Sequence, residues 1–299
     1  MKIFITGAGG FIGSCISKYL SGKGHDTVEF VRSKNGNLSS EGIPENTEVI
    51  VNAAGRLGTP EVSDEEFLLS NTELPGILGD CCSRRGIHII HLSTPGVTGL
   101  LPDASETLEY DPWGSYELSK TKGELILLEN DSLPSDLLTI LRPDFVYGPG
   151  DLHKLALFKQ VAKGWMPVIG RTGARIRPTF CEDVCRAVEA SLPGGVLNGG
   201  LFNIGGPDVI TVREFCNTIA SAMGRNLRAV PLPRVFFKLA LLLGPFCPDA
   251  LSESRLKLFG EDHYISIKKA ENSDFLPKYG IAEGTERTVS WYRSKGILP

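Results

Sequence analysis

The glycine-rich stretch at residues 7–13, which reads Gly-Ala-Gly-Gly-Phe-Ile-Gly, is the feature that most restricts how this chain folds. It follows a short apolar run at residues 2–6 and leads into residues 11–20, where apolar side chains recur at helical spacing. A helix that begins at such a loop presents backbone N–H groups and positive potential to a phosphate. The order of strand, loop and helix therefore predicts an α/β fold that binds a dinucleotide, rather than an ordinary turn.

The loop residues have separate expected roles. We expect Gly7 to allow the tight turn, Gly10 to let a diphosphate approach the backbone, and Gly13 to let the helix pack against the strand. Three other loop positions are expected to line the cofactor as well: Gly9, Phe11 and Ile12. The spacing is Gly-x-x-Gly-x-x-Gly, in place of the commoner Gly-x-Gly-x-x-Gly.

The rest of the chain alternates between apolar, strand-like runs and helical stretches. Strands are expected at residues 28–31, 47–52, 87–92 and 137–142, and helices at 65–84 and 116–130. This alternation predicts a doubly wound parallel Rossmann sheet. We expect a dinucleotide-binding Rossmann domain over residues 1–145 and a smaller mixed α/β substrate-binding lobe over residues 146–299, with residues 179–208 returning to the Rossmann domain.

The composition of the 299-residue chain excludes several classes of protein. A net charge of −4 provides no basic surface for nucleic acid. The longest apolar run, near residues 235–243, is interrupted by Lys238 and is far shorter than the roughly 20 residues of a membrane span. The 7 cysteines show no Cys-x-x-Cys spacing, so we expect reduced thiols in a cytoplasmic protein, without a disulfide framework or a metal site.

Tyr116 and Lys120 are the first candidates for chemistry. They stand four positions apart in a predicted helix and therefore share one face. An ammonium group beside a phenol favours the phenolate, so we expect Lys120 to lower the pKa of Tyr116 from about 10. Tyr116 would then donate and accept a proton near neutral pH. The alternative is a pair on an exposed helix without chemistry, which the glycine loop disfavours.

With this Tyr-x-x-x-Lys pattern and the loop spacing, the chain resembles the extended branch of the short-chain dehydrogenase/reductase superfamily, specifically the NAD-dependent epimerase/dehydratase family. Other segments look like landmarks of that family: Asn-Ala-Ala-Gly at 52–55, Ser-Thr at 93–94, Leu-Arg-Pro at 141–143, Val-Tyr-Gly-Pro-Gly-Asp at 146–151 and Phe-Asn-Ile-Gly-Gly at 202–206. The resemblance implies an NAD(P)-dependent oxidoreductase or epimerase that transfers hydride to or from a secondary alcohol or ketone carbon.

The resemblance also implies roles for single residues. Thr94 corresponds to the residue that donates a hydrogen bond to the substrate oxygen, with Ser93 as its substitute, and Lys120 to the lysine that binds the nicotinamide ribose. Cofactor contacts are implied for Asn52, Ala53, Ala54, Gly55 and Pro143, and substrate contacts for Phe145, Arg175 and Arg177. For both arginines a plain surface charge is the alternative. The resemblance further implies a homodimer through a four-helix contact of residues 65–84 and 116–130.

Two departures from the family pattern narrow the reaction. Dehydratases carry Asp-Glu after the threonine, where this chain has Pro95 and Gly96, so dehydration is not expected. Nucleotide-sugar epimerases carry Asn where Phe145 stands. The leading interpretation is a 4-epimerase or 4-ketoreductase that acts on a nucleotide-activated sugar. Phe145 and the apolar residues 235–246 favour an alternative, a ketoreductase with a more apolar, non-nucleotide substrate. A third, a non-catalytic cofactor-sensing protein, is disfavoured by the intact tyrosine–lysine pair.

The end of the second predicted strand bears on the choice of cofactor. Family members that use NAD place an Asp there to accept from the ribose 2′-hydroxyl, and here Val31 stands at that position, followed by Arg32 and Ser33. A guanidinium group suits a 2′-phosphate. NADP(H) is therefore favoured, and NAD(H) stays open because Glu29 lies two residues earlier and because Arg32 has a solvated loop charge as its alternative.

Overall fold

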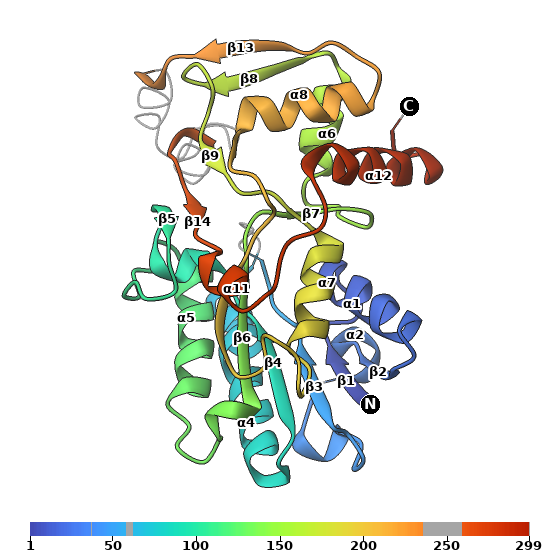
Figure 1. Ribbon diagram of the computed structural model, residues 1–299, viewed down its shortest axis with the longest axis vertical. Coiled ribbons are helices and arrows are strands. Elements are labelled where there is room, and N and C mark those ends of the chain that lie inside the picture. Colours follow the sequence, from blue (N-terminus) through green and yellow to red (C-terminus); the bar gives the residue numbers. More distant parts are fainter. Residues whose placement is uncertain (37, 58–61, 236–258, 299) are drawn as a thin grey trace.

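The computed structural model describes residues 1–36, 38–57, 62–235 and 259–298 (Figure 1). Its N-terminal part is built on a six-stranded parallel sheet with the order β11-β6-β4-β3-β1-β2. The strands are β1 (Lys2–Thr6), β2 (Asp26–Phe30), β3 (Val49–Asn52), β4 (His88–Leu92), β6 (Leu138–Pro143) and β11 (Gly200–Ile204). This sheet confirms the expected doubly wound α/β class.

Helices cover both faces of the sheet, as the apolar strands require. Helices α1 (Phe11–Gly22) and α7 (Cys181–Ala190) pack on one face, and α4 (Leu74–Arg85) and α5 (Ser115–Leu128) pack on the other. Alternate residues of β1 point to opposite sides: Ile3 and Ile5 join the cluster with α1 and α7, and Phe4 joins the cluster with α4 and α5.

The helix expected at residues 65–84 consists of three pieces. They are α3 (Asp64–Phe67), the π-helical turn η2 (Leu68–Glu73) and α4. Ser63 begins α3 with a capping box, in which its hydroxyl accepts from the Glu66 backbone N–H at 3.2 Å. A π-helical turn inserts an extra residue and rotates the following side chains, which brings η2 residues to the site described below.

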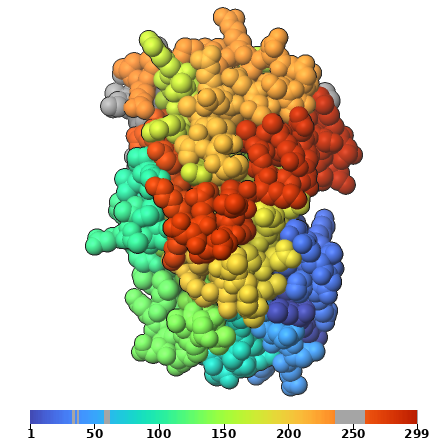
Figure 2. Space-filling view, in the orientation of Figure 1, coloured from blue at the N-terminus to red at the C-terminus, as the bar shows by residue number. Residues whose placement is uncertain are grey.

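The upper lobe in Figure 1 consists of short strand pairs and helices. The pairs are β8 (Trp165–Ile169) with β13 (Arg228–Leu232), β9 (Arg175–Ile176) with β12 (Ile210–Thr211), β7 (Val146–Tyr147) with β10 (Thr179–Phe180), and β5 (Pro102–Ala104) with β14 (Tyr264–Ile265). The helices of this lobe are α6 (Leu155–Ala162), α8 (Val212–Ala222) and α12 (Ile281–Ser294), whereas α11 (Lys268–Asn272) lies lower, against β11. The C-terminal residues, red in Figure 2, cover the junction between this lobe and the part that contains α7.

Short helical pieces complete the connections between strands. They are α2 (Arg32–Asn35), η1 (Ser40–Gly42), η3 (Pro95–Thr98) and η4 (Ser135–Leu137). No helix within the described ranges is long and apolar enough to cross a membrane. The same residues contain no group of three His, Cys, Asp or Glu side chains that could hold a metal ion. Most of the apolar segment 235–246 lies outside the described residues.

Candidate active site

The glycine loop lies against the chain segment that follows β3. Gly7 has a φ of +71°, and a Cβ atom on it would lie 2.5 Å from the Ala53 carbonyl oxygen. A Cβ atom on Gly13 would lie 2.1 Å from the Gly7 carbonyl oxygen, so α1 approaches the loop this closely only without a side chain there. Gly10 is the N-cap of α1 and has no side chain to bond the first N–H groups, which leaves them for an anion. The side chains of Phe11 and Ile12 are partly buried and pack against the hydrophobic core.

The end of β2 has no carboxylate directed at the loop. The Val31 side chain occupies that position, since its Cγ1 atom lies 2.8 Å from where a Cβ of Gly9 would be. Glu29 instead faces α1, where its Oε1 atom accepts from the Ser17 hydroxyl at 2.6 Å. Arg32 is exposed and donates from Nη1 to the Ser70 hydroxyl of η2 at 3.0 Å. The side chain of Ser33 lies outside the described residues.

Asn52 points into the protein rather than to the surface of the loop. Its Oδ1 atom accepts from the Thr6 hydroxyl at 2.7 Å and from the Ala54 N–H at 3.3 Å. Its Nδ2 atom lies 3.0 Å from Nδ1 of His91. Asn52 therefore joins the ends of β1, β3 and β4, and it fixes the backbone at Ala53 against the glycine loop.

Thr94, Tyr116 and Lys120 come together at the carboxyl end of β4. The Thr94 hydroxyl lies close enough to the Tyr116 phenol to influence its pKa. Lys120 lies one turn further along α5, and its Nζ atom donates to the Leu92 carbonyl oxygen at 2.9 Å. The same Nζ atom lies 3.1 Å from the position of a Cβ on Gly55, so the lysine lies beside the segment after β3.

The charge environment of Tyr116 differs from the expectation. Burial raises the pKa of Tyr116, the adjacent Glu117 carboxylate raises the pKa further, and the hydrogen bond with Thr94 opposes this rise. The prediction that Lys120 lowers the pKa of Tyr116 is therefore wrong for this structure, because the Lys120 ammonium is directed at the Leu92 carbonyl. Burial also lowers the pKa of Lys120, to about 8.

Asn71 joins the segment after β3 to helix α5. This residue of the π-helical turn η2 is fully buried, and its Oδ1 atom accepts from the Arg56 N–H at 2.9 Å. Its Nδ2 atom donates to the Ser119 hydroxyl at 2.9 Å. The next residue, Thr72, donates to the Ser119 carbonyl oxygen at 3.0 Å. These bonds fix the turn of α5 between Tyr116 and Lys120.

A buried ion pair fixes the other side of α5. Arg142 of β6 donates from Nε to Oε1 of Glu124 at 2.9 Å, and their side chains are only 2% and 0% exposed. The Tyr110 hydroxyl donates to Oε2 of the same Glu124 at 2.8 Å. This pair was not predicted from the sequence, although an arginine between Leu141 and Pro143 in an apolar strand indicates a buried partner.

Strands β4 and β6 place the remaining expected residues at the same edge. Ser93 donates from its N–H to the Leu141 carbonyl oxygen at 2.8 Å. Its buried hydroxyl has no partner within the described ranges, and Thr94 rather than Ser93 meets Tyr116. Pro143 is buried at the end of β6, paired in register with Ile204 of β11.

The two residues after β6 are unusual. Phe145 has a φ of +36°, in the left-handed region that disfavours a bulky residue, and its ring packs edge-on against Phe215 at 5.5 Å. Asp144 is 7% exposed, and its Oδ2 atom has no partner within the described residues. Burial raises the pKa of Asp144 to about 6, opposed by the charges of His263 and Lys154 among others. Asp144 was not predicted as a site residue, although a carboxylate directly after a parallel strand is typical of a site at that edge of the sheet.

Arg175 and Arg177 both form hydrogen bonds to other groups of the protein. The exposed Arg175 donates from Nε to Asp262 at 2.8 Å. Arg177 is half-buried and donates from Nε to the Ile265 carbonyl at 3.0 Å and from Nη1 to the Gly206 carbonyl at 2.8 Å. Both guanidinium groups thus hold residues 262–265 and the end of β11 in place.

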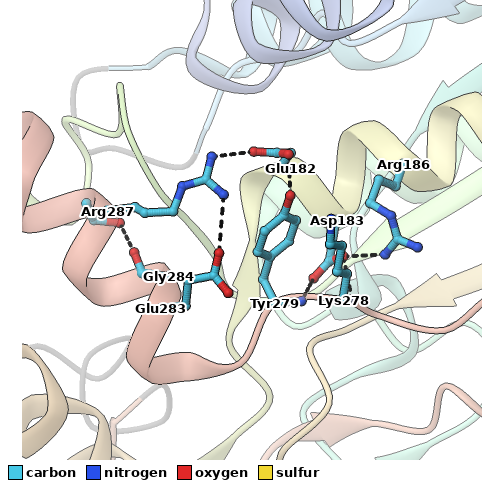
Figure 3. A network of polar contacts seen from close by, with 9 residues as sticks. Glu182, Asp183, Arg186, Lys278, Tyr279, Glu283, Gly284 and Arg287 are labelled. Carbon is cyan, nitrogen blue, oxygen red and sulfur yellow. Dashed lines mark hydrogen bonds and ion pairs between the residues drawn. The ribbon is translucent and has the colours of Figure 1, made fainter. Parts of the chain in front are cut away.

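The N-terminus of α7 is fixed to the C-terminal segment (Figure 3). Asp183 accepts from the N–H groups of Lys278 at 2.8 Å and Tyr279 at 3.1 Å. Glu182 accepts from the Tyr279 hydroxyl and from Arg287. Because these partners are about a hundred positions away, the network gave no signal in the sequence.

Comparisons with known proteins agree with this arrangement. A model of the NAD dependent epimerase/dehydratase family matches residues 3–205. The chain is 26% identical to a 2-alkyl-3-oxoalkanoate reductase of Stenotrophomonas maltophilia, over 96% of this chain and 98% of that protein. It is 25% identical to a UDP-glucose 4-epimerase of Mycolicibacterium smegmatis, over 99% of each.

A solved structure has the same fold. The dTDP-4-dehydrorhamnose reductase of Clostridium acetobutylicum superposes with a TM-score of 0.77 at 19% identity, over 98% of this chain and all of that chain. The family model covers more than half of the chain and includes the glycine loop, the Thr94 strand end and the Tyr116–Lys120 helix. This chain therefore belongs to the NAD-dependent epimerase/dehydratase family and is an NAD(P)-dependent enzyme of the epimerase and reductase type.

Proposed function

We propose that the protein is a ketoreductase, which transfers hydride reversibly between NADP(H) and a ketone or secondary alcohol carbon. The observation that carries this proposal is the meeting of the Thr94 hydroxyl and the Tyr116 phenol at the carboxyl end of β4, with Lys120 one turn further along α5. A substrate oxygen between the two hydroxyl groups would accept from both. Burial and Glu117 raise the pKa of Tyr116, which keeps its phenol protonated at neutral pH. Tyr116 is thus suited to donate a proton to the developing alkoxide while the bound reduced nicotinamide supplies the hydride.

Two classes of substrate are supported by different observations. A nucleotide-activated sugar, as a 4-keto sugar or its alcohol, is supported by the UDP-glucose 4-epimerase relative. A more apolar ketone without a nucleotide is supported by Phe145 and by the engagement of Arg175 and Arg177 with protein partners. In both cases the lobe of residues 146–299 would hold the part of the substrate away from the reacting carbon.

The proposed preference for NADP(H) rests on the end of β2. Val31 offers no acceptor to a ribose 2′-hydroxyl, and Glu29 is bonded to Ser17. Arg32 is exposed, and Ser70 holds its Nη1 atom beside the loop. An arginine held at one nitrogen retains further N–H donors for a phosphate.

The test is a substrate panel with purified protein. NADPH or NADH oxidation is followed with a nucleotide 4-keto sugar and with a 2-alkyl-3-oxoalkanoate, and UDP-glucose to UDP-galactose conversion is followed separately. We expect NADPH oxidation with one of the two ketones. Epimerisation without net oxidation of the cofactor would contradict the ketoreductase proposal. Absence of turnover with tight cofactor binding would favour the cofactor-sensing alternative.

We also propose a homodimer through α4 and α5. The two helices lie side by side, with Ile126 Cγ2 3.2 Å from a Cβ position on Gly76. Ile77 of α4 and Leu118 of α5 are apolar and exposed, as is Leu69 of the preceding turn η2. Light scattering at micromolar concentration should give twice the mass of the chain, and Leu118→Glu should halve it; a monomeric wild type would contradict the dimer.

A further inference from the structure

Three cysteine thiols from two helices meet where α1 packs on α7. Cys15 lies one turn after the start of α1, and Cys181 and Cys185 lie one turn apart on α7. The Sγ atom of Cys185 donates to Sγ of Cys15 at 3.1 Å, and Cys181 is hydrogen-bonded to Cys15 as well. Neither the proposed chemistry nor the proposed cofactor contacts use these thiols.

The three thiols differ in accessibility and acidity. Cys15 is partly exposed, whereas Cys181 and Cys185 are 3% and 0% exposed. The hydrogen bonds from the two α7 thiols lower the pKa of Cys15. A thiolate is the nucleophilic form of cysteine, so Cys15 is the member that a small oxidant reaches and reacts with. The two buried thiols lie directly behind it.

We propose that Cys15 and Cys185 form a modification site, which hydrogen peroxide converts to a reversible disulfide. The Cys15 thiolate attacks one peroxide oxygen, the O–O bond breaks, and hydroxide leaves a sulfenic acid on Cys15. The Cys185 sulfur then attacks the Cys15 sulfur, the S–O bond breaks, and the Cys185 proton leaves with the hydroxyl group as water. Two electrons pass from the two thiols to one peroxide.

The fold brings the two sulfur atoms close to bonding distance. An S–S bond is about 2.05 Å long, so the Sγ atoms at 3.1 Å must approach by roughly 1 Å. Helix α7 is also held by the C-terminal segment, because the N–H groups of Lys278 and Tyr279 donate to Asp183 (Figure 3). We therefore expect α1 to make most of this adjustment.

The main test uses the wild-type chain. Protein treated with peroxide is blocked with N-ethylmaleimide and examined by intact mass and by peptide mapping of all 7 cysteines. With blocking under denaturing conditions, we expect the oxidised chain to carry two fewer N-ethylmaleimide groups than the reduced chain, one cross-linked peptide pair that contains Cys15 and Cys185, and reversal by dithiothreitol. Because the bond joins distant parts of the chain, we also expect Tm to rise by roughly 5–15 °C.

Matched variants sharpen the assignment. Cys15→Ser should abolish the cross-link. Cys185→Ser should give a Cys15–Cys181 cross-link instead, because Cys181 is the second thiol that influences Cys15. Cys216→Ser, a buried cysteine of α8, is the control and should leave the wild-type cross-link unchanged. Mapping of the wild-type disulfide to another pair, or recovery of Cys15 as a free thiol at peroxide doses that oxidise Cys216, would overturn the proposal.

Discussion

The cofactor side and the substrate side of the active site differ in how their buried polar groups are satisfied. On the cofactor side, Asn52, Asn71 and Lys120 each bond to groups of the protein. On the substrate side, Asp144 leaves one oxygen without a partner in the described residues, and Phe145 keeps a left-handed backbone. Buried polar groups without partners and strained residues concentrate where ligands bind. Asp144 and Phe145 therefore mark a place on the substrate side that a group from outside can complete, whereas the three named side chains of the cofactor side already have protein partners.

The arginines of the two sides differ in the opposite sense, because the substrate side is the one where they are bonded to protein groups. Arg32 on the cofactor side is exposed, with Ser70 as its partner at 3.0 Å. Arg177 on the substrate side donates to two backbone carbonyls, and Arg175 is paired with Asp262. The arginine on the cofactor side is therefore exposed, whereas the two arginines expected to contact the substrate are bonded to groups of the protein. The predictions below separate these two sides.

Replacement of Tyr116 should have the largest effect, because the two sides meet at its hydroxyl. We expect Tyr116→Phe to lower kcat by about 100- to 10,000-fold, the range of a lost general acid, with cofactor affinity unchanged. Steady-state kinetics and a cofactor titration measure the two quantities. Tyr19→Phe, near the far end of α1, is the control. Turnover within a few-fold of wild type would exclude Tyr116 as the proton donor.

The second prediction concerns the ion pair that holds α5. Glu124→Gln leaves the Arg142 guanidinium buried without its carboxylate, which costs about 3–5 kcal/mol of unfolding free energy. Urea denaturation measures this loss. Glu129→Gln, at the exposed end of the same helix, should change stability by less than about 0.5 kcal/mol. An equal response of both variants would show that the pair does not stabilise the cofactor side.

The sequence predicted the cofactor side better because its residues are close together in the chain. The glycine loop and the Tyr116–Lys120 turn are each contiguous, so local spacing determines their geometry. It did not predict the inward direction of Asn52, which depends on Thr6 and His91 far away in the sequence. The sequence also predicted the wrong direction for the pKa shift of Tyr116. Burial and Glu117 raise this pKa, and the Lys120 ammonium is directed at the Leu92 carbonyl instead.

The substrate side was harder to predict because distant segments build it. Arg177 has backbone carbonyls as partners, at positions 206 and 265, and carbonyl groups leave no mark in a sequence. The exposure of Asp144 depends likewise on how the lobe closes over β6. A charged residue after a strand suggests a site, but only the fold tells whether its oxygen atoms are already satisfied.

The third prediction tests the unsatisfied carboxylate. Burial raises the pKa of Asp144 to about 6 from 3.8, so ionisation destabilises the folded protein. The stability that the protonated Asp144 carboxyl contributes is fully present below pH 3.8 and is lost as the pH rises through about 6. Asp144→Asn does not ionise, so it should be more stable than wild type by about 3 kcal/mol above pH 6 and by nearly nothing below pH 4.

Two readouts make this prediction specific to Asp144. Denaturation is measured from pH 4 to pH 8, with the exposed Asp208→Asn as the control that should follow wild type throughout. We expect kcat/KM to fall in Asp144→Asn while stability rises, as for a group kept for binding at the expense of stability. A pH-independent difference between Asp144→Asn and wild type would show that the carboxylate is satisfied in solution.

The smallest effect we expect is the one on cofactor choice, and it tests whether Arg32 is available to a phosphate. A charge-assisted hydrogen bond contributes about 1.5–3 kcal/mol, so NADPH should bind roughly 10- to 150-fold more tightly than NADH. Val31→Asp with Arg32→Asn should reverse the order, because the carboxylate accepts from a free 2′-hydroxyl and repels the phosphate. Ser70→Ala should reduce the preference without reversing it, since it removes the 3.0 Å bond that holds Nη1 of Arg32. Titration of both cofactors into each variant decides, with Arg84→Ala on α4 as the control. Tighter binding of NADH to the wild type would mean that Arg32 is directed to solvent, and that the guanidinium groups on both sides of the active site are without a phosphate.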